Sequence, residues 1–127
     1  MKSKYFADIK WSKKLAHHFQ DAEWYISPRT KRIVTRKSVK KVLVEYLPAV
    51  TTDMVLEKLP GEIEYKKKIW HLRIEKLKNG FSIEYIAYDN KGYFYVLPKP
   101  EKQLICDKKL PNVLCQMLEW LEKDGLL

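Results

Sequence analysis

The spacing of apolar residues changes halfway along the chain. In the first half they recur every three or four positions, which is typical of helices that bury one face. This spacing predicts helices over residues 12–22 and 36–47, and a shorter helix that begins after Thr51 or Thr52 and ends before Pro60. Residues 24–26 and 32–34 favour strands on either side of a turn, so we expect a small hairpin with a basic tip between the first two helices.

In the second half, from residue 63 to 97, apolar and polar residues alternate, as they do in an antiparallel sheet with one buried face. Turn signals at residues 78–80 and 89–92 divide this region into a three-stranded meander. A short edge strand is expected at residues 104–106. Pro111 then opens a C-terminal helix that ends before Gly125 and has a wide apolar stripe.

These elements predict one α+β domain over residues 1–127. It consists of three to five mainly antiparallel strands packed against the C-terminal helix, with two or three shorter N-terminal helices. No apolar run reaches the length of a membrane span, and the first residues lack the pattern of a signal peptide. We therefore expect a soluble cytoplasmic protein that does not bind membranes, with its two cysteines, Cys106 and Cys115, reduced and buried.

The positive charge is concentrated at the N-terminal end of the sequence. Residues 1–44 carry the whole net charge of +9, and residues 24–44 contribute +7 of it without a single acidic side chain. Such a segment attracts a polyanion or an acidic protein surface, although a solvated face that keeps the protein in solution is the simpler explanation. We expect a nucleic-acid-binding surface to include Lys10, Lys13, Lys14, Arg29, Lys31, Arg32, Arg36, Lys37, Lys40 and Lys41.

Two tyrosines extend this hypothesis. Residues 91–96, Lys-Gly-Tyr-Phe-Tyr-Val, resemble the central-strand motif of RNA-recognition domains over these six positions. Phe94 and Pro98 depart from that motif, and the helices that its fold requires are missing from the pattern. Tyr93 and Tyr95 nevertheless project to one face, where they either stack on unpaired bases or pack under the C-terminal helix, the more common role of strand aromatics.

Catalytic signals are weaker. Glu64-Tyr65-Lys66 matches half of a magnesium-dependent nuclease site, but a strand edge guarded by lysines explains it better. His17 and His18 are adjacent, so on a regular helix they lie about 100° apart and are not expected to share a metal ion. Glycine-rich phosphate loops are absent from the sequence. We therefore expect no metal and no cofactor, and favour a binding protein over an enzyme.

The leading hypothesis is a basic protein that contacts DNA or RNA through its cationic N-terminal third. The alternative is a regulator or inhibitor, of the kind that phages or mobile elements encode, which docks on an acidic or nucleic-acid-binding site of a partner protein. A nuclease that uses Glu64 and Lys66 is the third hypothesis. The two leading hypotheses differ in whether bare nucleic acid is bound with a steep dependence on salt.

Overall fold

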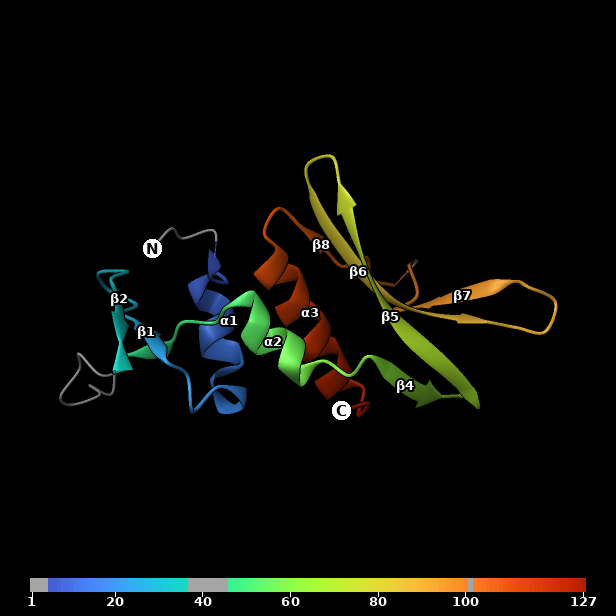
Figure 1. Cartoon of the computed structure of the whole chain (residues 1–127), viewed down its shortest axis with the longest axis horizontal. Helices are drawn as coiled ribbons and strands as arrows, with labels where there is room; N and C mark the ends of the chain where they lie inside the picture. Colours follow the sequence, from blue (N-terminus) through green and yellow to red (C-terminus); the bar gives the residue numbers. More distant parts are fainter. Residues whose placement is uncertain (1–4, 37–45, 101) are drawn as a thin grey trace.

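The computed structural model describes residues 5–36, 46–100 and 102–127, and it has the expected α+β class (Figure 1). Three α-helices lie between a small sheet at one end of the molecule and a larger sheet at the other (Figure 1). The elements in chain order are α1 (Ile9–Lys14), η2 (Ala16–His18), β1 (Trp24–Ile26), β2 (Ile33–Thr35), β3 (Leu47–Pro48), α2 (Thr52–Lys58), β4 (Glu62–Tyr65), β5 (Lys68–Leu77), β6 (Gly80–Tyr88), β7 (Phe94–Leu97), β8 (Cys106–Asp107) and α3 (Leu110–Lys123).

The small sheet has the strand order β2-β1-β3 and contains the hairpin that the sequence predicts. Its apolar side packs around Phe6, Ile26 and Ala49. The helix predicted over residues 36–47 falls mostly outside the described residues. Its expected end at about Leu47 is wrong, because Leu47 lies in β3, where it pairs with Ile26.

The first helix is shorter than predicted. Helix α1 begins three residues before Ser12, and after Lys14 the chain continues as the short 3₁₀ helix η2. The predicted apolar stripe is nevertheless buried, since Leu15, Phe19 and Ala22 are each less than 5% exposed. The spacing of these residues therefore identified the buried face correctly, although it overstated the length of the regular helix.

The larger sheet has the strand order β4-β5-β6-β7, and β8 also pairs with β6. It contains one more hairpin than the predicted meander, because β4 turns into β5 at Lys66 and Lys67. Both lysines have positive φ, of 50° and 62°. Two-residue hairpin loops require such angles and usually obtain them with Asn-Gly. A turn of two lysines gave no sequence signal, which is why β4 was missed as a separate strand.

Helix α3 packs on one face of the larger sheet, as predicted. Its apolar stripe, including Leu114 and Leu118, is fully buried in the main core together with Ile83 and Tyr85 of β6. The Tyr85 hydroxyl donates a hydrogen bond to the Pro60 carbonyl at 2.6 Å, which satisfies a polar atom inside the core. Within the described residues, no helix has the length and apolar character to cross a membrane.

A polar junction fixes the N-terminal segment to the start of α3. Asn112 is only 1% exposed; its side chain accepts from the Asp8 backbone N–H at 2.8 Å and donates to the Asp8 carboxylate at 2.9 Å. Lys109 also donates to that carboxylate, at 2.8 Å. The Lys109 hydrogen bond outweighs desolvation and, with the Asn112 bond, holds the pKa of Asp8 below its usual value. Because Asn112 is buried, loss of either hydrogen-bond partner would leave a buried polar group unsatisfied and would destabilise the fold.

The two cysteines differ, contrary to the expectation that both are buried. Cys115 of α3 lies in the core, where desolvation raises the pKa of its thiol to about 12. Cys106 is exposed in the short strand β8. Because β8 is an edge strand of only two residues, the Cys106 side chain is left uncovered. The apolar residues around Cys106 in the sequence did not indicate this exposure.

Candidate nucleic-acid interface

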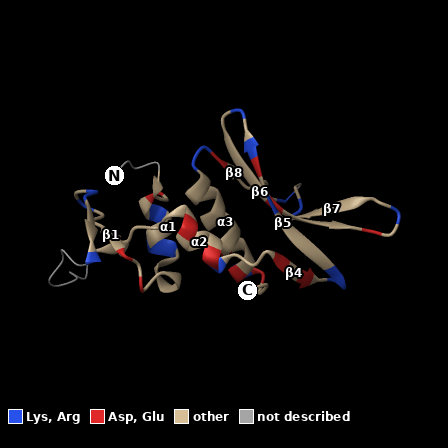
Figure 2. Cartoon of the chain, viewed as in Figure 1, with Lys and Arg blue, Asp and Glu red and all other residues tan. Residues whose placement is uncertain are grey.

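Among the basic residues predicted in the N-terminal third, those that the structure describes are exposed but dispersed. Arg29, Lys31 and Arg32 lie at the tip of the β1–β2 hairpin, and Arg36 follows β2 (Figure 2). Lys10, Lys13 and Lys14 are exposed on α1, while Lys37, Lys40 and Lys41 lie outside the described residues. Lys14 is shared between the Trp11 ring, at 5.1 Å, and Glu119 of α3, at 3.6 Å.

Tyr93 and Tyr95 lie at the opposite end of the molecule, on the hairpin formed by β6 and β7 (Figure 1). They are 67% and 44% exposed, so the expectation that they pack under α3 is wrong. The structure therefore separates the two tyrosines from the basic N-terminal residues with which the sequence analysis grouped them. The two sets form two surfaces and not one continuous interface.

Asp89 organises the loop that carries these tyrosines. Its Oδ1 accepts hydrogen bonds from the backbone N–H groups of Lys91 at 2.9 Å and Tyr93 at 3.0 Å, and its Oδ2 accepts from the Tyr95 hydroxyl at 3.2 Å. Desolvation opposes ionisation, yet these hydrogen bonds and the charge of Lys68 lower the pKa of Asp89. The ionised carboxylate thereby holds the Tyr95 ring in a fixed position at the sheet surface.

The Tyr95 ring forms one wall of a cleft that the sequence analysis did not anticipate. We call this the lysine cleft; it is an open hollow of about 470 Å³ between the β4–β5 turn and the chain that follows β7. Its lining contains three lysines, three aromatic residues and no carboxylate: Tyr65, Lys66, Lys68, Trp70, Tyr95, Val96, Leu97, Lys99 and Pro100. The ammonium of Lys68 lies 3.8 Å from the centroid of the Tyr95 ring, a cation–π contact.

Strand register explains how these side chains meet. Tyr65 pairs with Lys68 across the β4–β5 turn, and Tyr95 pairs with Ala87 of β6. Because side chains alternate along strands, Tyr65, Lys68 and Tyr95 all lie on the face of the sheet that α3 covers elsewhere. Past the C-terminal end of α3 this face is uncovered. A second hollow continues from the lysine cleft along that end and is lined by Lys102, Trp120 and Lys123 together with Glu119 and Asp124.

The residues of the nuclease hypothesis are not brought together. Glu64 lies on the face opposite Tyr65, next to a surface hollow that also includes Glu62 and Leu127. Lys66 instead lines the lysine cleft, where its ammonium lies 5.3 Å from the Tyr65 ring centroid. Glu62 pairs with His71 at 3.3 Å. The three-residue match therefore divides between two faces of the sheet.

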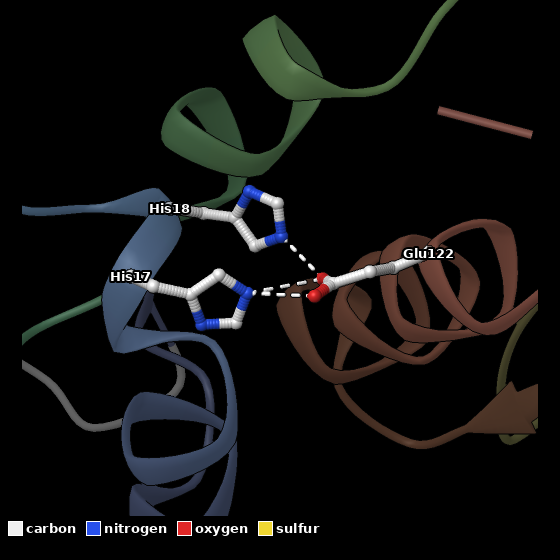
Figure 3. A group of neighbouring side chains, drawn as sticks. All are labelled: His17, His18 and Glu122. Atoms are coloured by element: carbon white, nitrogen blue, oxygen red, sulfur yellow. Dashed lines mark hydrogen bonds and ion pairs between the residues drawn. The ribbon is translucent and has the colours of Figure 1, made fainter. Parts of the chain in front are cut away.

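His17 and His18, which were not expected to share a metal, both contact the Glu122 carboxylate (Figure 3). The expectation assumed a regular helix, whereas both residues lie in η2 and their rings lie next to each other, with centroids 4.2 Å apart, and face the carboxylate from the same side (Figure 3). In the described part of the chain this is the one group of three His, Cys, Asp or Glu side chains placed to hold a single ion.

Sequence reasoning did not bring Lys66, Lys68, Lys99 and Tyr65 together in one cleft. An aromatic residue and three lysines occur together in the run Tyr65-Lys66-Lys67-Lys68, but this run was interpreted as a strand edge or as part of a nuclease site. The sequence contained no signal for the β4–β5 turn, which brings this run close to Tyr95. Comparisons with known protein families, curated proteins and solved structures found no match to this chain.

Proposed function

We propose that this protein binds single-stranded nucleic acid in the lysine cleft. The observation that carries the proposal is the composition of the cleft: three lysines and an exposed tyrosine ring without a carboxylate among the lining residues. Lysines supply contacts to phosphates, and aromatic rings supply surfaces on which unpaired bases stack. The two requirements of a single-strand site therefore occur together in one hollow.

The form of the cleft favours a single strand over a duplex. Stacking on Tyr95 requires a base whose face is free, which a paired base inside a helix does not offer. The volume of about 470 Å³ lies within the range of about 300–1,000 Å³ that is typical of pockets for small ligands, so a nucleotide unit is of suitable size. The second hollow, at the end of α3, extends the path of the nucleic-acid strand past Lys102 and Lys123.

The N-terminal cations have a supporting role in this proposal. Arg29, Lys31 and Arg32 are exposed at the far end of the molecule, so they raise the local concentration of a polyanion without reading bases. The proposal keeps the nucleic-acid partner that the sequence favoured, but it transfers the principal site from the N-terminal third to the larger sheet.

The test is fluorescence anisotropy with labelled single-stranded and double-stranded DNA and RNA of equal length, at 50 and 200 mM salt. We expect the single strands to bind more tightly. Contacts from three cleft lysines should reduce that affinity about 20-fold over this salt range. The double variant Lys66→Ala with Lys99→Ala should flatten the salt slope by about 0.7 per lysine, because two phosphate contacts are lost.

The matched control is Lys76→Ala with Lys78→Ala, which removes two exposed lysines at the other end of β5 and leaves the slope unchanged. Equal effects of the two double variants would show that only net charge matters. No binding of any nucleic acid at 50 mM salt would overturn the proposal and favour the regulator hypothesis, which a search for one tightly bound partner protein would then address.

A further inference from the structure

A three-residue cluster joins the N-terminal segment to the last turn of α3. The Nε2 atom of His17 lies 2.9 and 3.1 Å from the two Glu122 carboxylate oxygens, and Nε2 of His18 lies 2.5 Å from one of them (Figure 3). The candidate ligand atoms all lie within 4.8 Å of one another. From this geometry we propose that His17, His18 and Glu122 bind a divalent transition-metal ion, with zinc as the representative case.

Buried neighbours place the two histidines at this position. Leu15 and Phe19, which flank η2, are each only 2% exposed and anchor the segment in the core beside α3. The short 3₁₀ turn between them then directs both imidazoles towards Glu122. The backbone on both sides of the cluster is thus fixed. The His17 and Glu122 side chains, which are 52% and 41% exposed, retain freedom to move, whereas the His18 side chain is only 20% exposed.

The distances need only a small adjustment for coordination. Zinc bonds of 2.0–2.2 Å in tetrahedral geometry place neighbouring ligand atoms about 3.3 Å apart. The nitrogen–oxygen separations of 2.5–3.1 Å must therefore widen by less than about 1 Å, and any pair of ligand atoms as far apart as 4.8 Å must close by up to about 1.5 Å, movements that rotation of the exposed His17 and Glu122 side chains supplies. The ion would take the place of the protons that now lie between the imidazoles and the carboxylate.

Neighbouring charges leave Glu122 available to the histidines. Lys14 and Lys123 both pair with Glu119, at 3.6 and 3.4 Å. No ion pair between a lysine and Glu122 is found among the described residues, and the Glu122 carboxylate faces the two imidazoles. Imidazole nitrogens favour zinc, nickel or copper over magnesium and calcium, which require oxygen ligands. Three protein ligands leave a fourth position open to water.

Isothermal titration calorimetry of the tag-free, EDTA-treated full chain with zinc chloride tests the proposal. We expect one zinc ion per chain and no competition from magnesium. His17→Gln, His18→Gln and Glu122→Gln should each weaken zinc binding at least tenfold, since each removes a ligand. His71→Gln is the matched control, because it removes the other described histidine, which also pairs with a glutamate but has no third ligand. Its affinity should remain within twofold of that of the original protein.

Histidine side-chain NMR of the unsubstituted protein gives a second test that does not depend on the folding of variants. Zinc should shift the imidazole nitrogen signals of His17 and His18 and leave those of His71 in place. Cys106→Ser shows whether the exposed thiol contributes, and we expect it to leave the affinity unchanged. Absence of zinc binding, equal loss in His71→Gln, or unchanged imidazole signals of His17 and His18 would each overturn the proposal.

Discussion

The two ends of the molecule present positive charge in different ways. At the small sheet, Arg29, Lys31 and Arg32 lie exposed at a hairpin tip, whereas at the larger sheet three lysines line a hollow with an exposed tyrosine. The sequence concentrates its charge in the N-terminal third, with +7 over residues 24–44. A high density of charge along the sequence does not by itself create a binding site. Charged side chains around a concave surface do define a position for a ligand.

Charge reversal at each end should separate the contributions of the two basic surfaces to nucleic-acid affinity. Reversal in the lysine cleft is expected to have the largest effect of all the changes considered. Lys66→Glu, Lys68→Glu and Lys99→Glu together should weaken single-strand binding more than about a hundredfold, if each lost contact is worth about 1 kcal/mol or more. Arg29→Glu, Arg32→Glu and Arg36→Glu change the net charge equally and should cost less than about tenfold, through long-range attraction alone. Anisotropy titrations at one salt concentration make the comparison. A greater loss from the arginine variant would place the main site at the small sheet.

Loss of the Asn112 side chain should loosen the N-terminal end without altering the lysine cleft. Asn112→Ala removes the acceptor of the Asp8 N–H and should lower the free energy of unfolding by about 1–3 kcal/mol. Urea unfolding measures this loss, and Asn90→Ala in the exposed hairpin loop should change stability by less than about 0.5 kcal/mol. Hydrogen exchange should become faster near Asp8 and stay unchanged in β6. Equal acceleration in both would show that the two ends unfold as one unit.

Removing the Tyr95 ring should have a smaller effect that is confined to binding. Tyr95→Ala should weaken single-strand affinity at least about fivefold, since one base stacked on an aromatic ring contributes about 1–3 kcal/mol. Tyr95→Phe keeps the ring but loses the hydroxyl bond to Asp89, so it should retain most of the affinity that Tyr95→Ala loses. Tyr88→Ala is the control, because Tyr88 is 64% exposed on the opposite face of the same hairpin. A similar loss in the Tyr88 variant would mean that hairpin stability, and not stacking, governs affinity.

Acid should produce the smallest effect, at the junction of the N-terminal segment. The pKa of Asp8 is lowered in the folded protein, so its stabilising contribution is complete above the unfolded value of about 4. The contribution is lost as the pH falls through the folded pKa. Because the Asp8 side chain is half-exposed, we expect a loss of less than about 1 kcal/mol. Urea unfolding at pH 6 and pH 3 should show a larger acid-induced loss for the original protein than for Asp8→Asn; equal losses would show that the Lys109 pair contributes nothing.

Local patterns predicted the elements whose signals are local. Pro111, the apolar stripe of α3 and Gly125 define that helix from neighbouring residues alone, and the hairpin of β1 and β2 is equally explicit. The β4–β5 turn was missed because lysines occupy positions where Asn-Gly is the usual signal. Local pattern therefore fails where the backbone adopts a conformation that its residues disfavour.

The candidate sites depend on relations that local patterns do not contain. Alternation predicted that Tyr93 and Tyr95 share a strand, but Tyr93 lies just before β7, and whether a helix covers Tyr95 depends on relative lengths. A helix of 14 residues is about 21 Å long, whereas a strand of 10 residues, such as β5, extends about 33 Å. Part of the sheet therefore remains uncovered. The contact of His18 with Glu122 joins residues 104 positions apart, and only the packing of η2 beside α3 brings them together.

The β4–β5 turn has a consequence for protein engineering. Lys66 and Lys67 both adopt left-handed backbone angles, which cost a non-glycine residue about 1–2 kcal/mol each. A stabilisation campaign that scored only folding energy would select Asn-Gly at these positions. Such a protein would tolerate heat better but would lose a lysine at the mouth of the cleft. Thermal screening alone would thus select against a lysine of the proposed site, so this turn is one that optimisation should leave unchanged.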